Sequence, residues 1–255
     1  MFMAKELVLS RLLTTGKCLF LAYDQGLEHG PTDFNDENIN PLYIIALAKK
    51  GKFNAFICQK GIAEKYKKEI KASKIPLILK LNGKTNLSHG EPLSTQLCTV
   101  TEAVKLGAIA VGYTIYIGSE HEAIMLKEFE EIEREAHAKG MPVIAWIYPR
   151  GKSVAGKPEK ELLAYSARVG LEIGADIVKL HWNGNKSDLE WAVKAAGKCK
   201  LVVAGGLKTD ERTLLKQARD AMQSGASGLA IGRNIWQAKN PLELTKKIKK
   251  IIWNE

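Results

Sequence analysis

One lysine stands inside an almost wholly apolar run of the sequence. Lys179 lies in 176-DIVKLHW-182, although lysine is among the residue types least often fully buried. Burial and a cationic neighbour both favour the neutral amine, which can attack a ketone and form a Schiff base. Lys80, in 75-IPLILKLN-82, is a second lysine of this kind. Lys80 could supply that neighbouring charge or be the nucleophile itself. The alternative for Lys179 is a structural lysine paired with a carboxylate.

Two further side chains near the ends of apolar runs could act beside such an imine. Tyr148, in 146-WIYPRG-151, can donate and accept a proton, or it could be a tyrosine at the rim of the core. Asp24, in 23-YDQGLEHGP-31, ends an otherwise apolar run. It could hold a substrate hydroxyl or orient the lysine, or it could form a turn before Gly26.

Two glycine-containing segments late in the chain favour a phosphate site. They are 203-VAGGL-207 and 230-AIGRN-234, and each continues an apolar run. Glycine lets backbone N–H groups approach an anion closely, and an arginine adds a fork-shaped cation. The predicted phosphate-binding residues are Gly205, Gly206, Gly232 and Arg233.

Other residues are weaker candidates for the same site. Arg150 and the segment 151-GKSVAGK-157 could meet a second anionic group, or they could form a flexible surface loop. His29 follows the first apolar run and is a candidate substrate contact. His181 shares the predicted face of Lys179, but no second His or Cys stands at the spacing of a metal site. We therefore expect no metal.

Eight apolar runs bounded by Gly, Pro, Asn or Asp predict strands that are buried on both faces. They cover residues 17–24, 53–59, 75–82, 108–117, 142–149, 176–182, 200–206 and 227–233. Helical patterns fill the gaps between them. Strands that alternate with helices predict an α/β fold, a (β/α)8 TIM barrel, in a single domain over residues 1–255. A doubly wound parallel sheet is the alternative.

Local patterns predict details of three helices. A helix over 119–139 should begin with a capping box formed by Ser119 and Glu122. The last helix should begin at Pro241. In the helix over 158–173, the side chains expected to face the core are Leu162, Ser166, Val169 and Ile173.

Alternation along the strands brings the chemical groups together. Every second side chain of a strand points to the same face, and the active sites of such barrels lie at the carboxyl ends of the strands. Counting along the runs, the groups expected to converge inside the barrel mouth are Asp24, Lys80, Tyr148 and Lys179.

The composition is that of a globular protein, because 45% of the 255 residues are hydrophobic and 26% are charged. No apolar stretch approaches the roughly 20 residues of a membrane span, and we recognise no signal peptide at the start. The net charge of +10 suits an anionic substrate, and the lysines are dispersed along the chain, so we expect no nucleic-acid partner. The cysteines lie too far apart for a disulfide framework and fit a reducing cytoplasm; they are Cys18, Cys58, Cys98 and Cys199.

These motifs together resemble the archaeal-type class I fructose-bisphosphate aldolases of the DeoC/FbaB aldolase family. The resemblance rests on YDQGLEHGP, WIYPRG, ADIVKLHW and the AGG and IGRN segments, and it covers essentially the whole barrel. It implies that Lys179 forms the Schiff base, that Tyr148 is the acid and base, and that Asp24 lies in the active site. It also places Trp146 in the site and a substrate phosphate on the Gly-Gly and Gly-Arg loops.

The implied activity is that of a lyase of glycolysis and gluconeogenesis that needs no metal and no cofactor. It would cleave fructose 1,6-bisphosphate reversibly to dihydroxyacetone phosphate and glyceraldehyde 3-phosphate. Family members form homo-oligomers, including large rings, so we expect a homo-oligomer in the cytoplasm that binds a phosphorylated sugar and no membrane.

Two departures from the family pattern leave the exact substrate open. Gln25 stands where many relatives have His, and Leu207 stands where some have Pro. The alternatives within the family are a 2-amino-3,7-dideoxy-D-threo-hept-6-ulosonate synthase and a lysine-dependent thiolase. Outside it stand a barrel that binds phosphorylated ligands without chemistry and a flavin-phosphate barrel.

Overall fold

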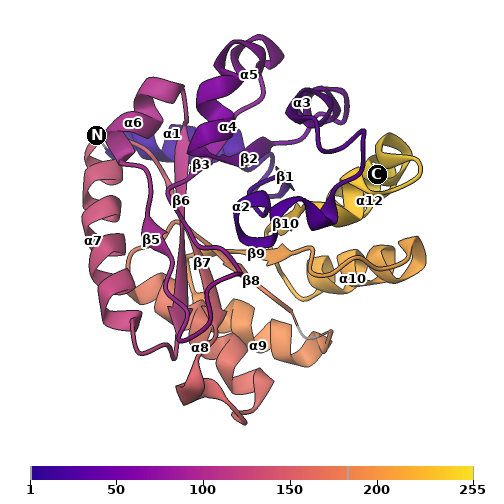
Figure 1. The fold of residues 1–255 in the computed structure, drawn as a ribbon. Helices are drawn as coiled ribbons and strands as arrows, with labels where there is room; N and C mark the ends of the chain where they lie inside the picture. Colours follow the sequence, from indigo (N-terminus) through magenta and orange to yellow (C-terminus); the bar gives the residue numbers. More distant parts are fainter. Residues whose placement is uncertain (1, 183, 255) are drawn as a thin grey trace.

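The computed structural model describes residues 2–182 and 184–254, and its centre is a closed barrel of parallel strands (Figure 1). The barrel strands are β1 (Cys18–Ala22), β2 (Ala55–Gln59), β3 (Leu77–Lys80), β6 (Ala110–Ile117), β7 (Val143–Pro149), β8 (Ile177–Leu180), β9 (Lys200–Ala204) and β10 (Gly228–Ile231). Their order around the barrel is β1-β10-β9-β8-β7-β6-β3-β2. Each strand lies within one predicted run, so the predicted barrel is confirmed and the doubly wound sheet is wrong.

Helices follow the strands in sequence and surround the barrel (Figure 1). They are α1 (Phe2–Leu12), α2 (Gly26–His29), α3 (Pro41–Lys50), α4 (Lys60–Lys65), α5 (Lys67–Ser73), α6 (Val100–Leu106), α7 (Glu122–Ala138), α8 (Glu159–Glu172), α9 (Lys186–Ala196), α10 (Glu211–Gln223), α11 (Arg233–Trp236) and α12 (Pro241–Trp253). Shorter elements are the 3-10 turns η1 (Gly30–Asp33) and η2 (Lys152–Val154), and the antiparallel pair β4 (Asn82–Gly83) and β5 (Thr95–Gln96). The last helix begins at Pro241, as the sequence predicts.

A glycine makes the closure of the barrel possible, where β1 pairs with β10. Cys18 lies opposite Gly228 in this pair, and the φ of Gly228 is +153°. A Cβ atom at this glycine would lie 2.0 Å from the carbonyl oxygen of Cys18. A larger residue would therefore push the two strands apart.

A second glycine creates room for a tryptophan inside the barrel. Trp146 on β7 is only 1% exposed. Its ring fills the space beside Gly112 on β6, where a Cβ atom would lie 1.6 Å from the ring carbon Cζ3. The glycine thus allows the largest side-chain type to lie inside the barrel, at the level of Lys179 on the neighbouring strand β8.

The predicted capping box at the start of α7 is wrong. The helix begins at Glu122 with His121 at the N-cap position, and no side chain caps it there. The hydroxyl of Ser119 instead donates to the carbonyl of Pro92, at 2.7 Å. The carboxylate of Glu122 accepts from the backbone N–H of Gly118. The cap is therefore absent because Ser119 binds a distant loop and Glu122 binds the residue directly after β6.

The buried face of α8 is rotated away from the predicted stripe. The residues buried on this helix are Leu163, Ala164, Ser166, Ala167 and Gly170, so only Ser166 of the predicted set is fully buried. The other predicted residues, Leu162, Val169 and Ile173, are half-buried. A Cβ atom at Gly170 would lie 2.8 Å from a methyl group of Val178, so small residues let the helix approach β8 closely.

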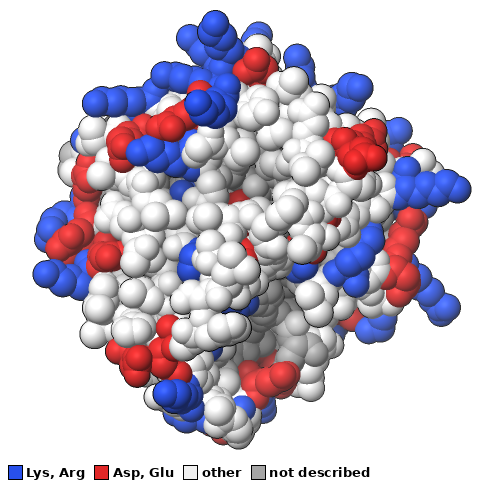
Figure 2. All heavy atoms as spheres, viewed as in Figure 1, with Lys and Arg blue, Asp and Glu red and all other residues white. Residues whose placement is uncertain are grey.

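The lysines are dispersed along the chain but concentrated in space. Residues 41–76 and 241–254 contain thirteen lysines and three glutamates, a balance that equals the +10 of the whole chain. These segments include α3, which packs against both α5 and α12. Lys249 on α12 donates to the carbonyl of Lys52. Figure 2 shows lysines projecting over α5, while the middle of the same face carries few charged atoms.

Two further observations concern the membrane and the cysteines. In the part of the chain that the structure describes, no helix is long and apolar enough to cross a membrane. The four cysteines are buried and unpaired, as the sequence predicts.

Candidate active site

A cavity of about 690 Å³ opens at the carboxyl ends of the barrel strands. All the residues that the sequence singles out as catalytic or substrate-binding line it: Asp24, His29, Lys80, Trp146, Tyr148, Arg150, Lys179, Gly205, Gly206, Gly232 and Arg233. They come from six of the barrel strands, β1, β3, β7, β8, β9 and β10, or from the loops that follow them. The predicted convergence of Asp24, Lys80, Tyr148 and Lys179 on the barrel mouth is therefore confirmed.

Lys179 occupies a buried place on the floor of this cavity. Lys179 is 7% exposed, and its Nζ atom lies 5.0 Å from the centre of the Trp146 ring. No carboxylate of the described residues lies within ion-pair distance of it. Burial lowers the pKa of Lys179 to about 8, and the positive charge of Lys80 lowers it further against the opposing effect of Asp24. A sizeable fraction of the amine is therefore neutral near pH 7 to 8, as a nucleophile requires.

Lys80 differs from Lys179 in having a carboxylate partner. Its Nζ atom lies 3.3 Å from Oδ2 of Asp24, and both residues are buried. Burial alone would raise the pKa of Asp24, but the charges of Lys80 and Lys179 lower it overall. An ammonium held by an ionised carboxylate is a poor nucleophile. The geometry thus favours Lys179 as the reactive amine and Lys80 as the neighbouring charge.

Tyr148 points into the cavity from the end of β7 and is 9% exposed. Its ring stacks on the imidazole of His181, with ring centres 4.3 Å apart and an interplanar angle of 29°. Burial, followed by the charge of Asp24, raises the pKa of Tyr148 well above its usual value of 10. The phenol is therefore protonated at neutral pH and can donate a proton toward the cavity.

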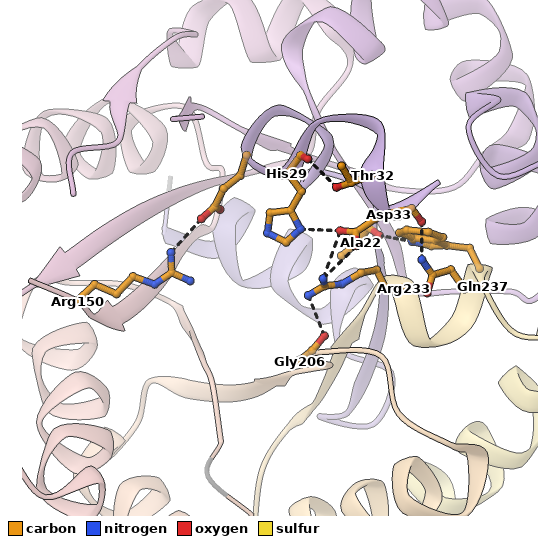
Figure 3. A network of polar contacts seen from close by, with 10 residues as sticks. Ala22, His29, Thr32, Asp33, Arg150, Gly206, Arg233 and Gln237 are labelled. Atoms are coloured by element: carbon orange, nitrogen blue, oxygen red, sulfur yellow. Dashed lines mark hydrogen bonds and ion pairs between the residues drawn. The ribbon is translucent and has the colours of Figure 1, made fainter. Parts of the chain in front are cut away.

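Arg150 follows β7 and lies on one side of the cavity mouth. Its guanidinium donates to the carboxylate of Glu28 at 2.9 Å (Figure 3). It lies 5.6 Å from the centre of the Tyr148 ring. It also lies 5.2 Å from the ring of Tyr116. The segment that follows Arg150, residues 151–157, does not line the cavity. Only the arginine of this predicted anion-binding segment therefore faces the site.

The two glycine loops lie on the other side of the mouth, after β9 and β10. Gly206 has a φ of +65°, and a Cβ atom on Gly232 would lie 2.7 Å from the carbonyl oxygen of Ala22. The N–H of Gly205 donates to the carbonyl of Ala230. It is therefore already engaged, which leaves Gly206 and the start of α11, after Gly232, as the places where N–H groups can meet an anion.

A polar network fixes Arg233 beside these loops. Its guanidinium lies 3.3 Å from both carboxylate oxygens of Asp33 and 3.3 Å from the carbonyl oxygen of Gly206 (Figure 3). His29 contacts the same carboxylate through Nδ1, at 2.6 Å. The Nδ1 atom of His29 is therefore engaged by Asp33, so the histidine supports Arg233 through this carboxylate instead of offering Nδ1 to a substrate.

Sequence reasoning missed three residues of the site. Glu28 and Asp33 hold Arg150 and Arg233, and both come from the α2–η1 segment, residues 26–33. Their signal was present in the run EHGPTD, but their partners are distant in the sequence. The third is His181. The sequence predicts that it shares the inward face of Lys179, but it predicts no role for the imidazole, because no second His or Cys stands at the spacing of a metal site.

Two buried N–H donors of the site have no hydrogen-bond partner among the described residues: Nε2 of Gln25 and Nε1 of Trp146. Both residues line the cavity. Within the described ranges, no group of three or more His, Cys, Asp or Glu side chains could hold a metal ion. The chemistry that this site can support is that of an amine, a phenol, a carboxylate and two arginines.

Comparison with known proteins agrees with this arrangement. Residues 18–238 match the family model described as DeoC/LacD family aldolase. A protein of Thermoproteus tenax named fructose-bisphosphate aldolase class 1 is 45% identical over 241 residues, which cover 93% of this chain and 90% of that protein. A protein of Methanocaldococcus jannaschii named fructose-bisphosphate aldolase/6-deoxy-5-ketofructose 1-phosphate synthase is 37% identical over 94% of this chain and 81% of its own length.

A solved structure shares both the fold and the sequence pattern. It is an archaeal fructose-1,6-bisphosphate aldolase whose catalytic lysine is covalently bound to the carbinolamine intermediate of the substrate. The two chains superpose with a TM-score of 0.92 at 43% identity, over 98% of this chain and 99% of that one. This chain belongs to the DeoC/LacD family of aldolases.

Proposed function

We propose that this protein is a Schiff-base-forming class I aldolase that cleaves fructose 1,6-bisphosphate reversibly. The products are dihydroxyacetone phosphate and glyceraldehyde 3-phosphate. The observation that carries the proposal is Lys179, a buried amine with a pKa of about 8 and no carboxylate within ion-pair distance in the described part of the chain. The name of the relative from Thermoproteus tenax supports the same substrate.

The reaction begins with the amine of Lys179. It attacks the C2 carbonyl of the sugar, and the carbinolamine that forms loses water to give a protonated imine. This iminium withdraws electrons from the C3–C4 bond, so the bond can break toward an enamine. The ring of Trp146, 5.0 Å from Nζ, can stabilise the positive charge during these steps.

Tyr148 moves the protons of the reaction in this proposal. The phenol gives its proton to the C2 hydroxyl that leaves as water, and the phenolate then takes the proton of the C4 hydroxyl as C3–C4 cleaves. Glyceraldehyde 3-phosphate leaves, and the same proton returns to C3 of the enamine. Asp24, held by Lys80, positions the C4 hydroxyl. Hydrolysis of the remaining imine releases dihydroxyacetone phosphate and restores Lys179.

The two phosphates of the substrate occupy opposite sides of the mouth. The phosphate on C1 contacts Gly206, Gly232 and Arg233, because β9 and β10 follow β8 around the barrel. The phosphate on C6 lies toward Arg150, beyond Tyr148. The partners of these arginines, Glu28 and Asp33, keep both guanidinium groups in place before the substrate arrives.

A second candidate reaction uses the same lysine. The name of the relative from Methanocaldococcus jannaschii includes a 6-deoxy-5-ketofructose 1-phosphate synthase, and that protein also carries the aldolase name. An enzyme of this kind, or a heptulosonate synthase, would keep the Schiff base and change the aldehyde partner. Product analysis with different aldehydes separates these possibilities from the proposed one.

The assembly and the location belong to the same proposal. We expect a homo-oligomer, as the family resemblance implies. The four buried, unpaired cysteines support a reducing compartment, the cytoplasm.

Borohydride trapping tests the proposal. The purified protein is incubated with dihydroxyacetone phosphate in excess EDTA, reduced, digested and mapped by mass spectrometry. A reduced adduct on Lys179, absent from the Lys179→Met variant, is the expected result, together with cleavage of fructose 1,6-bisphosphate. An adduct on Lys80 would move the nucleophile. The absence of any adduct in folded wild-type protein would contradict the proposed function.

A further inference from the structure

His181 lies beside the reactive lysine but takes no part in the steps proposed above. It stands two residues after Lys179, so its side chain points to the same interior face of the barrel. It lines the cavity at the end of β8, nearer to the mouth than the lysine. The residue is exposed to this cavity rather than packed into the core.

The contacts of the imidazole leave its polar atoms available. One face stacks on Tyr148, with ring centres 4.3 Å apart. Neither ring nitrogen has a hydrogen-bond partner within residues 2–182 and 184–254. The ring is thus held in orientation by stacking, while its nitrogen atoms remain free to bind something that enters the cavity.

The imidazole is neutral at physiological pH. The protein atoms around the cavity partly desolvate the ring, and this effect, followed by the positive charges of Lys179 and Arg150, lowers the pKa of His181 to about 4. A neutral imidazole offers one N–H donor and one acceptor nitrogen, which suits a hydroxyl group better than a phosphate. A neutral imidazole also adds no further positive charge beside Lys179 and Lys80.

The position of His181 indicates which part of the sugar it meets. If Lys179 holds C2 and the glycine loops after β9 and β10 hold the phosphate on C1, the remaining carbons extend toward β7. His181 leans that way, because it stacks on Tyr148 rather than on the β9 loop. Tyr148 and Asp24 already serve the C4 hydroxyl, and Arg150 serves the phosphate on C6. Within the aldehyde half of the sugar, carbons 4 to 6, the C5 hydroxyl is then the polar group without an assigned partner.

We propose that His181 binds the C5 hydroxyl of the substrate, which is the C2 hydroxyl of the aldehyde product, and thereby selects a hydroxylated aldehyde. The proposal rests on the proposed aldolase function. It makes His181 a specificity-determining residue that acts on the aldehyde half alone. Sites built to hydrogen-bond a substrate hydroxyl discriminate strongly against analogues that lack it.

The test compares two aldehydes in the synthetic direction with dihydroxyacetone phosphate. One is glyceraldehyde 3-phosphate, and the other is 3-phosphooxypropanal, which keeps the chain length and the phosphate but lacks the hydroxyl. In the His181→Phe variant, the ring still stacks on Tyr148 but cannot hydrogen-bond. We expect kcat/KM for glyceraldehyde 3-phosphate to fall about tenfold or more, and kcat/KM for the deoxy analogue to stay within about twofold.

Two further variants act as controls. His181→Gln, which offers a donor and an acceptor, should recover part of the preference for the hydroxylated aldehyde. His89→Phe makes the same substitution at an exposed histidine outside the cavity and should change neither rate. Trapping of dihydroxyacetone phosphate on Lys179 should be the same in all of them, because the ketone half does not touch His181.

The outcomes separate the two proposals. Equal losses with both aldehydes in His181→Phe would show that the histidine acts only through Tyr148, and would overturn its role in specificity. Unchanged kinetics with both aldehydes would overturn it as well. Failure of the wild-type protein to trap dihydroxyacetone phosphate would instead contradict the aldolase function itself.

Discussion

The ammonium group of Lys80 lies 3.3 Å from the carboxylate of Asp24, in the same barrel mouth where Lys179 has no carboxylate within ion-pair distance among the described residues. Two inward lysines therefore differ in their surroundings, because one has a carboxylate partner and the other does not. The pair also acts on Lys179 in two directions. Lys80 lowers its pKa, and Asp24 raises it.

Replacing Lys80 by methionine removes the charge that opposes protonation of Lys179. It also leaves the carboxylate of Asp24 without its partner, so both effects raise the pKa of Lys179 above its present value of about 8. The pH at which borohydride trapping reaches half its maximal rate should move to higher pH. Trapping at pH 7 should become several-fold slower. A profile that stays at the wild-type position would show that Lys80 does not tune the nucleophile.

The Asp24→Asn variant should move the same profile in the opposite direction. Loss of the carboxylate removes the larger of the two influences that raise the pKa of Lys179, the other being Glu28, so the trapping midpoint moves to lower pH. Cleavage of fructose 1,6-bisphosphate should nevertheless fall by roughly 10²-fold or more, since the C4 hydroxyl loses its partner. The protein should also lose roughly 3–5 kcal/mol of stability, because Lys80 is left as an unpaired buried charge. Denaturant titration beside the trapping profile measures both effects.

Tyr148→Phe should separate proton transfer from packing. Phenylalanine retains the ring that stacks on His181 at 4.3 Å, so the fold should change little. Cleavage of fructose 1,6-bisphosphate should fall by roughly 10²–10⁴-fold, which is the usual effect of losing a general acid or base. Steady-state kinetics and thermal unfolding check the two parts. A loss below tenfold would assign the proton to another group.

Arg150→Met should distinguish a sugar with two phosphates from one with a single phosphate. The arginine lies on the Tyr148 side of the mouth, away from the glycine loops. We expect KM for fructose 1,6-bisphosphate to rise roughly 10–100-fold, the effect of losing a charge-assisted hydrogen bond. The response to fructose 1-phosphate should change less than threefold. Equal losses with both sugars would place Arg150 outside the C6 phosphate site.

Much of the fold could be predicted from the sequence because buried parallel strands have a strong local signal. The run around Lys179 is apolar on both sides, and alternation alone indicates that Lys179 and His181 share a face. The phosphate-binding loops after β9 and β10 could also be predicted, since glycines and an arginine follow the two strands that often hold a phosphate in such barrels. The lysines, the tyrosine, the aspartate and the glycine loops of the site are therefore predictable from local sequence signals.

What could not be predicted depends on partners that are distant in the chain. Glu28 binds Arg150, and Asp33 binds Arg233, across separations of more than a hundred residues. Which of the two lysines pairs with a carboxylate depends on the position of the Asp24 side chain, which the spacing in the sequence does not reveal. The hydroxyl of Ser119 donates to Pro92 instead of capping α7, and this partner is also distant in the sequence. The lysines cluster because α3 packs against both α5 and α12, which are far apart in the chain.

The amino end of the barrel offers a prediction on stability that is independent of the active site. Asp176, just before β8, accepts from the backbone N–H of Val143 at 2.8 Å and lies 2.8 Å from both Lys5 and His137. Burial would raise the pKa of Asp176, but these partners lower it overall. Its side chain is 8% exposed, so solvent screens the contacts little.

A carboxyl whose pKa is lowered by folding stabilises the protein above the pKa of the unfolded chain, near 3.9, and loses this effect as the pH falls through the folded value. Asp176→Asn should therefore cost about 3 kcal/mol at pH 7, and the difference from wild type should shrink as the pH approaches 3. Denaturant titrations at several pH values measure this, with kcat/KM for fructose 1,6-bisphosphate expected to remain unchanged. A difference that is constant with pH would mean that the ionised carboxylate is not what holds α1, α7 and β8 together, and that shape alone makes the aspartate necessary there.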